Sequence, residues 1–216
     1  MIDEYLKIAE LLDNEYHKRL TVVNELKSKG FSIHSIFLTE FCRFVSYLAT
    51  ADNTISDAEV EFINEYFHVN LNRKQINDLA GTLDETYVKT LPLPAIIYHE
   101  IETEVDNNYQ LDHVKNFYGI LGDLFVSCDG HVDPKEKVKF GIYLKNLRKN
   151  VQNLKAGRYG SIDISRKQQN AIKIIEKHKT KNETKNKMTP TDTCSKCGFK
   201  NRPTAKFCTQ CGNKLI

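Results

Sequence analysis

The chain has 216 residues, of which 40% are hydrophobic and 27% are charged. This length and composition suit one domain of ordinary size plus a small module, and they exclude collagen-like, mucin-like and wholly disordered chains. No stretch approaches the roughly 18 uninterrupted apolar residues of a membrane span, and the acidic start of the sequence, with Asp3 and Glu4, differs from a secretory signal. We therefore expect a cytoplasmic protein without a membrane span, for which peripheral membrane association stays open.

The charges are distributed unevenly along the chain. Residues 1–144 contain 13 Lys and Arg against 24 Asp and Glu, whereas residues 145–216 contain 18 against 4. This polarity predicts two modules with different electrostatic roles. The basic part could bind nucleic acid, anionic lipid or the acidic part of the same chain, and the sequence does not choose between these partners.

Helical periodicity dominates the acidic part. Apolar residues recur every three or four positions over residues 3–27, which predicts one long helix ended by Gly30. The same pattern predicts helices over residues 35–50, from Pro94 to Val105, and over residues 109–126. No segment alternates convincingly between apolar and polar residues, so we expect an all-α fold, a compact multi-helix bundle.

These patterns divide the chain into three parts. Residues 1–150 form the acidic helical domain, residues 151–193 form a basic linker, and residues 194–216 form a small metal-binding module. Within the linker, a short helix is expected over residues 165–179, and the polar stretch up to residue 193 has the composition of a flexible tether.

Two Asp-rich turns in the acidic domain resemble each other. Residues 51–59 align with residues 128–136 at a shift of 77 positions, and each turn follows a strongly apolar helix and opens another. The sequence therefore predicts an internal duplication of a helix-turn-helix unit.

The acidic residues of these turns have two interpretations. In the first, Ser56 and Asp133 cap the following helices, and Glu59 and Glu136 lie three residues later, in the capping-box position. In the second, the carboxylates gather where the turns meet and bind a hard divalent cation, Ca²⁺ or Mg²⁺. The residues of this candidate cation site are Asp52, Glu59, Asp129, Asp133 and Glu136.

The same turns resemble the duplicated signature of the tellurite-resistance TerB-like domain, an apolar helix ending in Ala-Asp-Gly-x-Ile/Val before a helix that opens with Glu. Residues 129–136 match this signature, and residues 52–59 match more loosely because Asn53 replaces the Gly. The resemblance covers roughly residues 30–150. It implies a compact helical bundle, metal binding by the acidic residues, a role in bacterial stress responses, and assembly with partner proteins, often at the inner face of the membrane.

Two Cys-x-x-Cys pairs predict a metal centre near the end of the sequence. A Gly follows each pair and permits a tight turn that aims both sulfurs at one ion. Four thiolates complete a tetrahedral shell, so the site is structural; iron fits the same spacing, but zinc is the commoner occupant. The zinc ligands are Cys194, Cys197, Cys208 and Cys211.

This segment closely resembles the short zinc-ribbon modules appended to many bacterial and archaeal proteins, which bind protein partners or nucleic acid. The sequence contains no phosphate-binding Gly loop, nucleophile elbow or His-Glu-x-x-His motif, so we do not expect an enzyme. Cys42 and Cys128 stand in apolar surroundings and are expected to be buried. Two functions remain: a non-enzymatic adaptor whose ribbon docks on a protein partner, and an accessory factor that binds nucleic acid through its basic part.

Overall fold

A computed structural model of the chain describes residues 2–15, 18–83, 91–105, 110–130, 132–158 and 164–180. The chain divides into two compact units, Met1–Thr180 and Lys181–Ile216. The second unit, which contains the expected zinc ribbon and most of the expected tether, lies outside the described residues.

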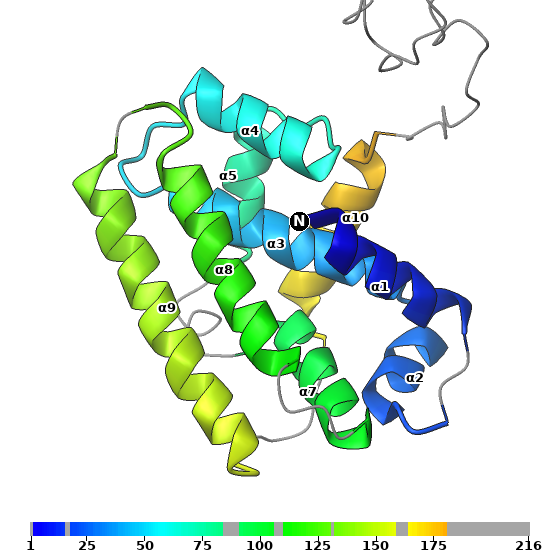
Figure 1. Cartoon of the computed structure of the whole chain (residues 1–216). Helices are drawn as coiled ribbons and strands as arrows, with labels where there is room; N and C mark the ends of the chain where they lie inside the picture. Colours follow the sequence, from blue (N-terminus) through cyan, green and yellow to red (C-terminus); the bar gives the residue numbers. More distant parts are fainter. Residues whose placement is uncertain are drawn as a thin grey trace, which may run out of the picture. The chain divides into compact units, whose positions relative to one another are not determined.

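The first unit is a bundle of helices (Figure 1). Its described residues form nine helices: α1 Ile2–Asn14, α2 Thr21–Ser28, α3 Ile33–Ala49, α4 Asp57–Phe67, α5 Arg73–Gly81, α7 Leu93–Val105, α8 Gln110–Val126, α9 Pro134–Lys155 and α10 Arg166–His178. The only β interaction in this described part is an isolated antiparallel bridge between Val69 and Lys179. The expected helical fold class is therefore confirmed for the described residues.

Helix α3 is the centre of this bundle. It contacts each of the other eight described helices, and every residue in it except Tyr47 is buried. A helix that is buried on all sides needs an almost continuous apolar sequence, which residues 33–49 largely provide. Ser32 caps the start of the helix, since its hydroxyl accepts a hydrogen bond from the Ser35 amide, while the Asp13 carboxylate accepts from the amides of Ile33 and His34.

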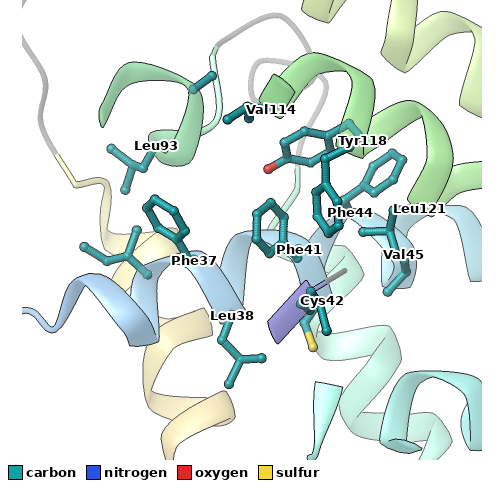
Figure 2. Close-up of a cluster of buried hydrophobic side chains, with 14 of the residues drawn as sticks. Phe37, Leu38, Phe41, Cys42, Phe44, Val45, Leu93, Val114, Tyr118 and Leu121 are labelled. Atoms are coloured by element: carbon teal, nitrogen blue, oxygen red, sulfur yellow. The ribbon is translucent and has the colours of Figure 1, made fainter. Parts of the chain in front are cut away.

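Aromatic side chains fill the space between α3 and α8 (Figure 2). Phe41 packs edge-on against Phe117 and Tyr118, with ring centroids 4.7 Å and 5.4 Å apart, and Phe44 lies 5.1 Å from Tyr118. Such edge-to-face pairs stabilise a core beyond the burial of their apolar area. Cys42, at the same level of α3, is fully buried, and burial raises the pKa of its thiol.

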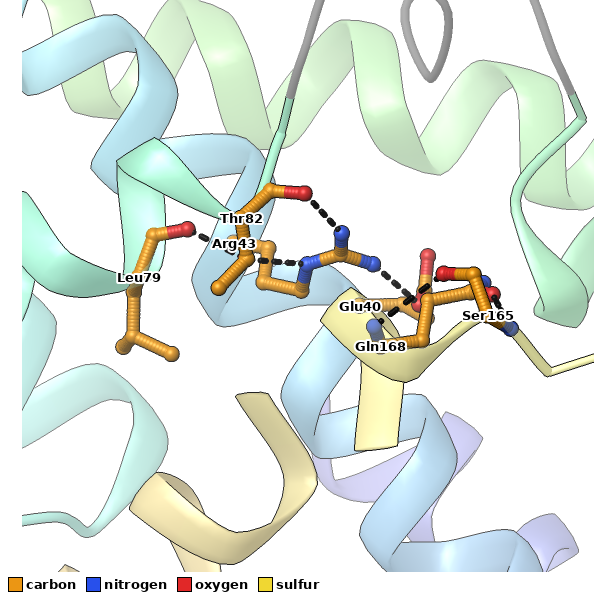
Figure 3. A network of polar contacts seen from close by, with 6 residues as sticks. All are labelled: Glu40, Arg43, Leu79, Thr82, Ser165 and Gln168. Atoms are coloured by element: carbon orange, nitrogen blue, oxygen red, sulfur yellow. Dashed lines mark hydrogen bonds and ion pairs between the residues drawn. The ribbon is translucent and has the colours of Figure 1, made fainter. Parts of the chain in front are cut away.

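A buried polar network surrounds Glu40 and Arg43 of α3 (Figure 3). The guanidinium group of Arg43 has no solvent exposure; it donates to Glu40 Oε1 at 2.8 Å and to both the hydroxyl and the carbonyl oxygen of Thr82, each at 2.8 Å. The amide of Gln168, in α10, donates to the same Glu40 oxygen at 3.3 Å. Burial raises the pKa of Glu40 and the nearby Arg43 lowers it, with a net increase.

The first predicted helix is wrong in one respect, because the structure divides residues 3–27 into α1 and α2. The ammonium group of Lys27 donates to the backbone carbonyls of Leu12 and Glu15, at 2.9 Å and 2.7 Å, and so ties the end of α1 to α2. Both helices bury apolar residues in the same core. The periodicity therefore continues across the break and conceals it.

The helical unit also extends beyond the expected boundary at residue 150. Helix α9 continues to Lys155, and α10, capped by Ser165, packs against α3 and α5. After α10, the backbone pairs with residues 68–70: the amide of Asn70 donates to the carbonyl of His178, and that of Thr180 to the carbonyl of His68. Ala171, Ile172 and Ile175 anchor this basic helix in the core.

The close packing of α8 against α9 supplies a matched test. A Cβ atom at Gly122 would overlap the ring of Phe140, whereas one at Gly119, also in α8, would meet nothing within 4 Å. We expect Gly122→Ala to lower the free energy of unfolding by about 1–3 kcal/mol because the ring must move. Gly119→Ala should raise it by up to about 1 kcal/mol, since Ala restricts the unfolded chain. Chemical denaturation of both variants measures this contrast, and equal effects would contradict the packing.

Candidate functional site

The first Asp-rich turn connects α3 to α4. Asn53 adopts a left-handed backbone conformation with φ 69°, which explains why an Asn can stand where the second turn has a Gly. The Asp52 carboxylate accepts a hydrogen bond from the Thr54 amide at 2.8 Å, so it is used within its own turn. Ser56 and Glu59 then form the expected capping box: the Ser56 hydroxyl accepts from the Glu59 amide, and Glu59 Oε2 accepts from the Ser56 amide at 2.6 Å.

The second turn connects α8 to α9 and is closed differently. Gly130 has φ 76°, and the Asp133 carboxylate caps α9 by accepting from the Lys135 amide at 2.6 Å. Pro134 occupies the first turn of the helix, where it has no N–H to leave unpaired. The reciprocal hydrogen bond expected from Glu136 is absent from the capping geometry of α9, so the capping-box prediction is confirmed for Glu59 and wrong for Glu136.

Lys139 links the two turns. Its ammonium group donates to the Thr50 hydroxyl, at the end of α3, at 3.0 Å and lies 4.2 Å from the centre of the Tyr47 ring. Burial lowers the pKa of Lys139, and the nearby Glu136 carboxylate partly opposes this change. The start of α9 is thereby held against the end of α3, which brings the two acidic turns together.

Glu59 and Glu136 meet at this junction. Both side chains are almost fully buried, with 5% and 8% exposure. Burial, a hydrogen bond with Glu59 and the negative charges of Glu59, Asp129 and Asp133 raise the pKa of Glu136 from 4.5 to about 8. Among the described residues, Oε1 of Glu59 is buried and accepts no hydrogen bond from an N–H group. Two buried carboxyl groups in contact must share a proton or a cation, because both cannot remain ionised without one.

Three further groups, Cys128, Asp129 and Asp133, lie within electrostatic range of this pair. The Cys128 thiol is half-buried, and its pKa is raised to about 11 by burial and by the charges of Glu59, Asp129 and Glu136. Cys128 is therefore a protonated thiol at neutral pH.

Of the five predicted cation ligands, the structure brings Glu59 and Glu136 into contact, places Asp129 and Asp133 near them, and uses Asp52 in its own turn. Within the described ranges, no cluster of three or more His, Cys, Asp and Glu side chains has the geometry of a metal site.

The four predicted zinc ligands, Cys194, Cys197, Cys208 and Cys211, lie outside the described residues. Their chemistry fits zinc nevertheless, since four cysteines in two Cys-x-x-Cys pairs are the donor set of a closed tetrahedral zinc centre.

Comparison with known proteins supports this part of the chain. Residues 193–215 match the family model of the zinc-ribbon domain. The chain has no significant match among curated proteins or among solved structures. The likeness of the helical unit to the TerB-like domain thus rests on its own residues and its helical fold. Among the helices that the structure describes, none has the length and apolar character required to cross a bilayer.

The carboxyl pair predicts an unusual pH dependence in metal-free buffer. Because the pKa of Glu136 is about 8 in the folded chain and 4.5 is its ordinary value, the folded chain holds an extra proton between these values. Stability should therefore fall as the pH rises through this window. We expect Glu136→Gln, which removes the charge and keeps the shape, to raise the free energy of unfolding by about 1–2 kcal/mol at about pH 9 and much less at about pH 5.

Denaturant unfolding across this pH range measures the effect. Glu61→Gln, at an exposed position of the same helix α4 as Glu59, is the matched control and should change neither the stability nor its pH dependence. A gain from Glu136→Gln that is equal at both pH values would show that the pair carries no extra proton.

Proposed function

We propose that this chain is a non-enzymatic adaptor whose zinc ribbon docks on a partner protein. The division of the chain carries this proposal: a packed helical unit ends at Thr180, and a separate unit follows that contains the ribbon match. A zinc ion held by four thiolates has no open coordination position, so its role is to fold the ribbon into a binding surface. The resemblance of the Asp-rich turns to the TerB-like signature supports a role for this adaptor in a bacterial stress response.

The helical unit contributes a divalent cation site in this proposal. The two turns connect α3 to α4 and α8 to α9, and Glu59 and Glu136 occupy aligned positions in the proposed duplication. Their burial against each other supports a cation, Ca²⁺ or Mg²⁺, as the alternative to a shared proton. Asp129 and Asp133 supply further oxygen ligands, and Asp52 joins them when it leaves the Thr54 amide.

A nucleic-acid-binding accessory factor is the second candidate. The observation that favours it is the charge of residues 145–216, where 18 Lys and Arg stand against 4 Asp and Glu. Lysines in the matched ribbon region, such as Lys196 and Lys206, would contact phosphate groups.

Zinc removal separates the two functions. We expect the full chain to contain about one zinc per molecule by elemental analysis, and the double variant Cys194→Ser/Cys208→Ser to contain none while its helical unit unfolds as before. An adaptor should crosslink to one cellular protein at low and high salt, and this product should be lost in the Cys→Ser variant. Binding to random-sequence DNA that weakens steeply with salt would favour the second candidate instead.

Calcium titration tests the cation site. The zinc-loaded full chain should unfold at a higher temperature in millimolar Ca²⁺ or Mg²⁺, because a ligand that binds only the folded state stabilises it by about 2.7 kcal/mol at a hundred times its Kd. The double variant Glu59→Gln/Glu136→Gln should lose this increase, and Glu61→Gln should keep it. If neither ion changes the unfolding temperature of the unmodified chain, the acidic residues cap helices and share a proton only.

A further inference from the structure

The solvent-facing side of α9 carries an unpartnered apolar pair. Val138 is 62% exposed and Ile142 is 50% exposed, although large apolar residues of a surface helix normally face the core. Both line a shallow hollow together with Ala51. Lys135 and Lys145 lie about one helical turn beyond the pair, one on each side, so this face has the order Lys, Val, Ile, Lys.

The charge of this face has one sign. Helix α9 contains seven Lys and Arg residues and one acid, Glu136, which is buried. Among the described residues, no carboxylate pairs with Lys135, Lys145 or Lys149 within 4.0 Å. The face therefore fits an apolar stripe that is flanked by acids.

Helix α1 presents such a stripe. Ile8 and Leu11 are 36% and 57% exposed, and Glu4 and Glu15 are exposed on the same face, giving the order Glu, Ile, Leu, Glu, with one lysine, Lys7, at its edge. Glu15 follows the last residue of α1, but its amide still donates to the carbonyl of Leu11, so it continues the helical path.

The two faces match in length as well as in charge. Lys135 and Lys145 are about 15 Å apart along a helix axis, and Glu4 and Glu15 are about 17 Å apart, at about 1.5 Å per residue. In an antiparallel arrangement, Glu15 would lie opposite Lys135 and Glu4 opposite Lys145. The apolar pairs would then meet between them, with Leu11 over the hollow at Val138.

We infer that the outer face of α9, centred on Val138 and Ile142, binds the outer face of α1, centred on Ile8 and Leu11, in a second copy of this chain. Charge selects this pairing over the symmetric ones, because two α9 faces would oppose lysines to lysines and two α1 faces would oppose acids to acids. It also disfavours residues 181–216 as the occupant of the α9 face, since they contain eight Lys and Arg and two Asp and Glu.

The position of the two helices determines the type of assembly. Helices α1 and α9 lie at opposite edges of the helical unit (Figure 1). One copy can therefore use both faces at once with two different neighbours, so the association is head-to-tail and grows with concentration. It needs neither zinc nor a divalent cation, and its failure would leave the proposed adaptor function unaffected.

Sedimentation of the zinc-loaded full chain in reducing buffer tests this contact. The average mass should rise with protein concentration and should fall at high salt, because Lys–Glu pairs flank the apolar centre. Leu11→Gln and Ile142→Gln should each weaken association about tenfold or more, since central apolar residues contribute most of an interface's affinity. Each variant keeps one intact face, so an equimolar mixture of the two should restore association as pairs that do not grow further.

The matched control is Ile120→Gln in α8, where an isoleucine is similarly exposed, at 46%. This variant should associate like the unmodified chain. A chain that stays monomeric at all concentrations, or a mixture that does not restore pairs, would overturn the inference. So would an Ile142→Gln variant that associates normally and loses binding only to anionic vesicles or to DNA, because the α9 face would then serve a different ligand.

Discussion

The burial of Arg43 in the centre of the bundle is the constraint on which the surrounding helices depend. Helix α3 contacts every other described helix, so a charged residue within it cannot reach water and must find its partners inside the protein. Glu40 supplies the opposite charge, Thr82 fixes the end of α5, and Gln168 brings α10 onto the remaining side. Removing one member of such a network typically costs about 3–5 kcal/mol, because a buried charge remains unpaired.

The acidic turns obey a different constraint. Capping alone requires one carboxyl oxygen from Glu59, and its Oε2 atom fulfils that role. It does not require that a second acid, Glu136, be buried against the first, where each ionised carboxylate raises the free energy of the other. A shared proton or a bound cation offsets this cost. The junction is therefore either pH-sensitive or cation-sensitive, and Lys139 holds the turns together in both cases.

Local sequence signals predicted the local features well. Periodicity identified the apolar helix α3, and the spacing of Ser56 and Glu59 predicted a capping box that the structure contains. The missed features depend on contacts between distant residues. The interruption between α1 and α2 is stabilised by Lys27, and the incorporation of the basic α10 depends on Gln168, which reaches Glu40 across 128 positions of sequence. Lys27 has no local pattern that distinguishes it from an ordinary surface residue, and the capping-box position of Gln168 after Ser165 predicts a helix start but no distant partner.

The distribution of charge in sequence also differs from its distribution in space. By sequence, an acidic part precedes a basic part, but the helical unit includes α9 and α10, so strongly basic and strongly acidic helices share one folded body. A second copy that approaches along α9 meets positive charge, whereas one that approaches along α1 meets acids such as Glu4 and Glu15. The inferred head-to-tail contact uses this opposition of charge, and it should therefore weaken as salt screens the charges.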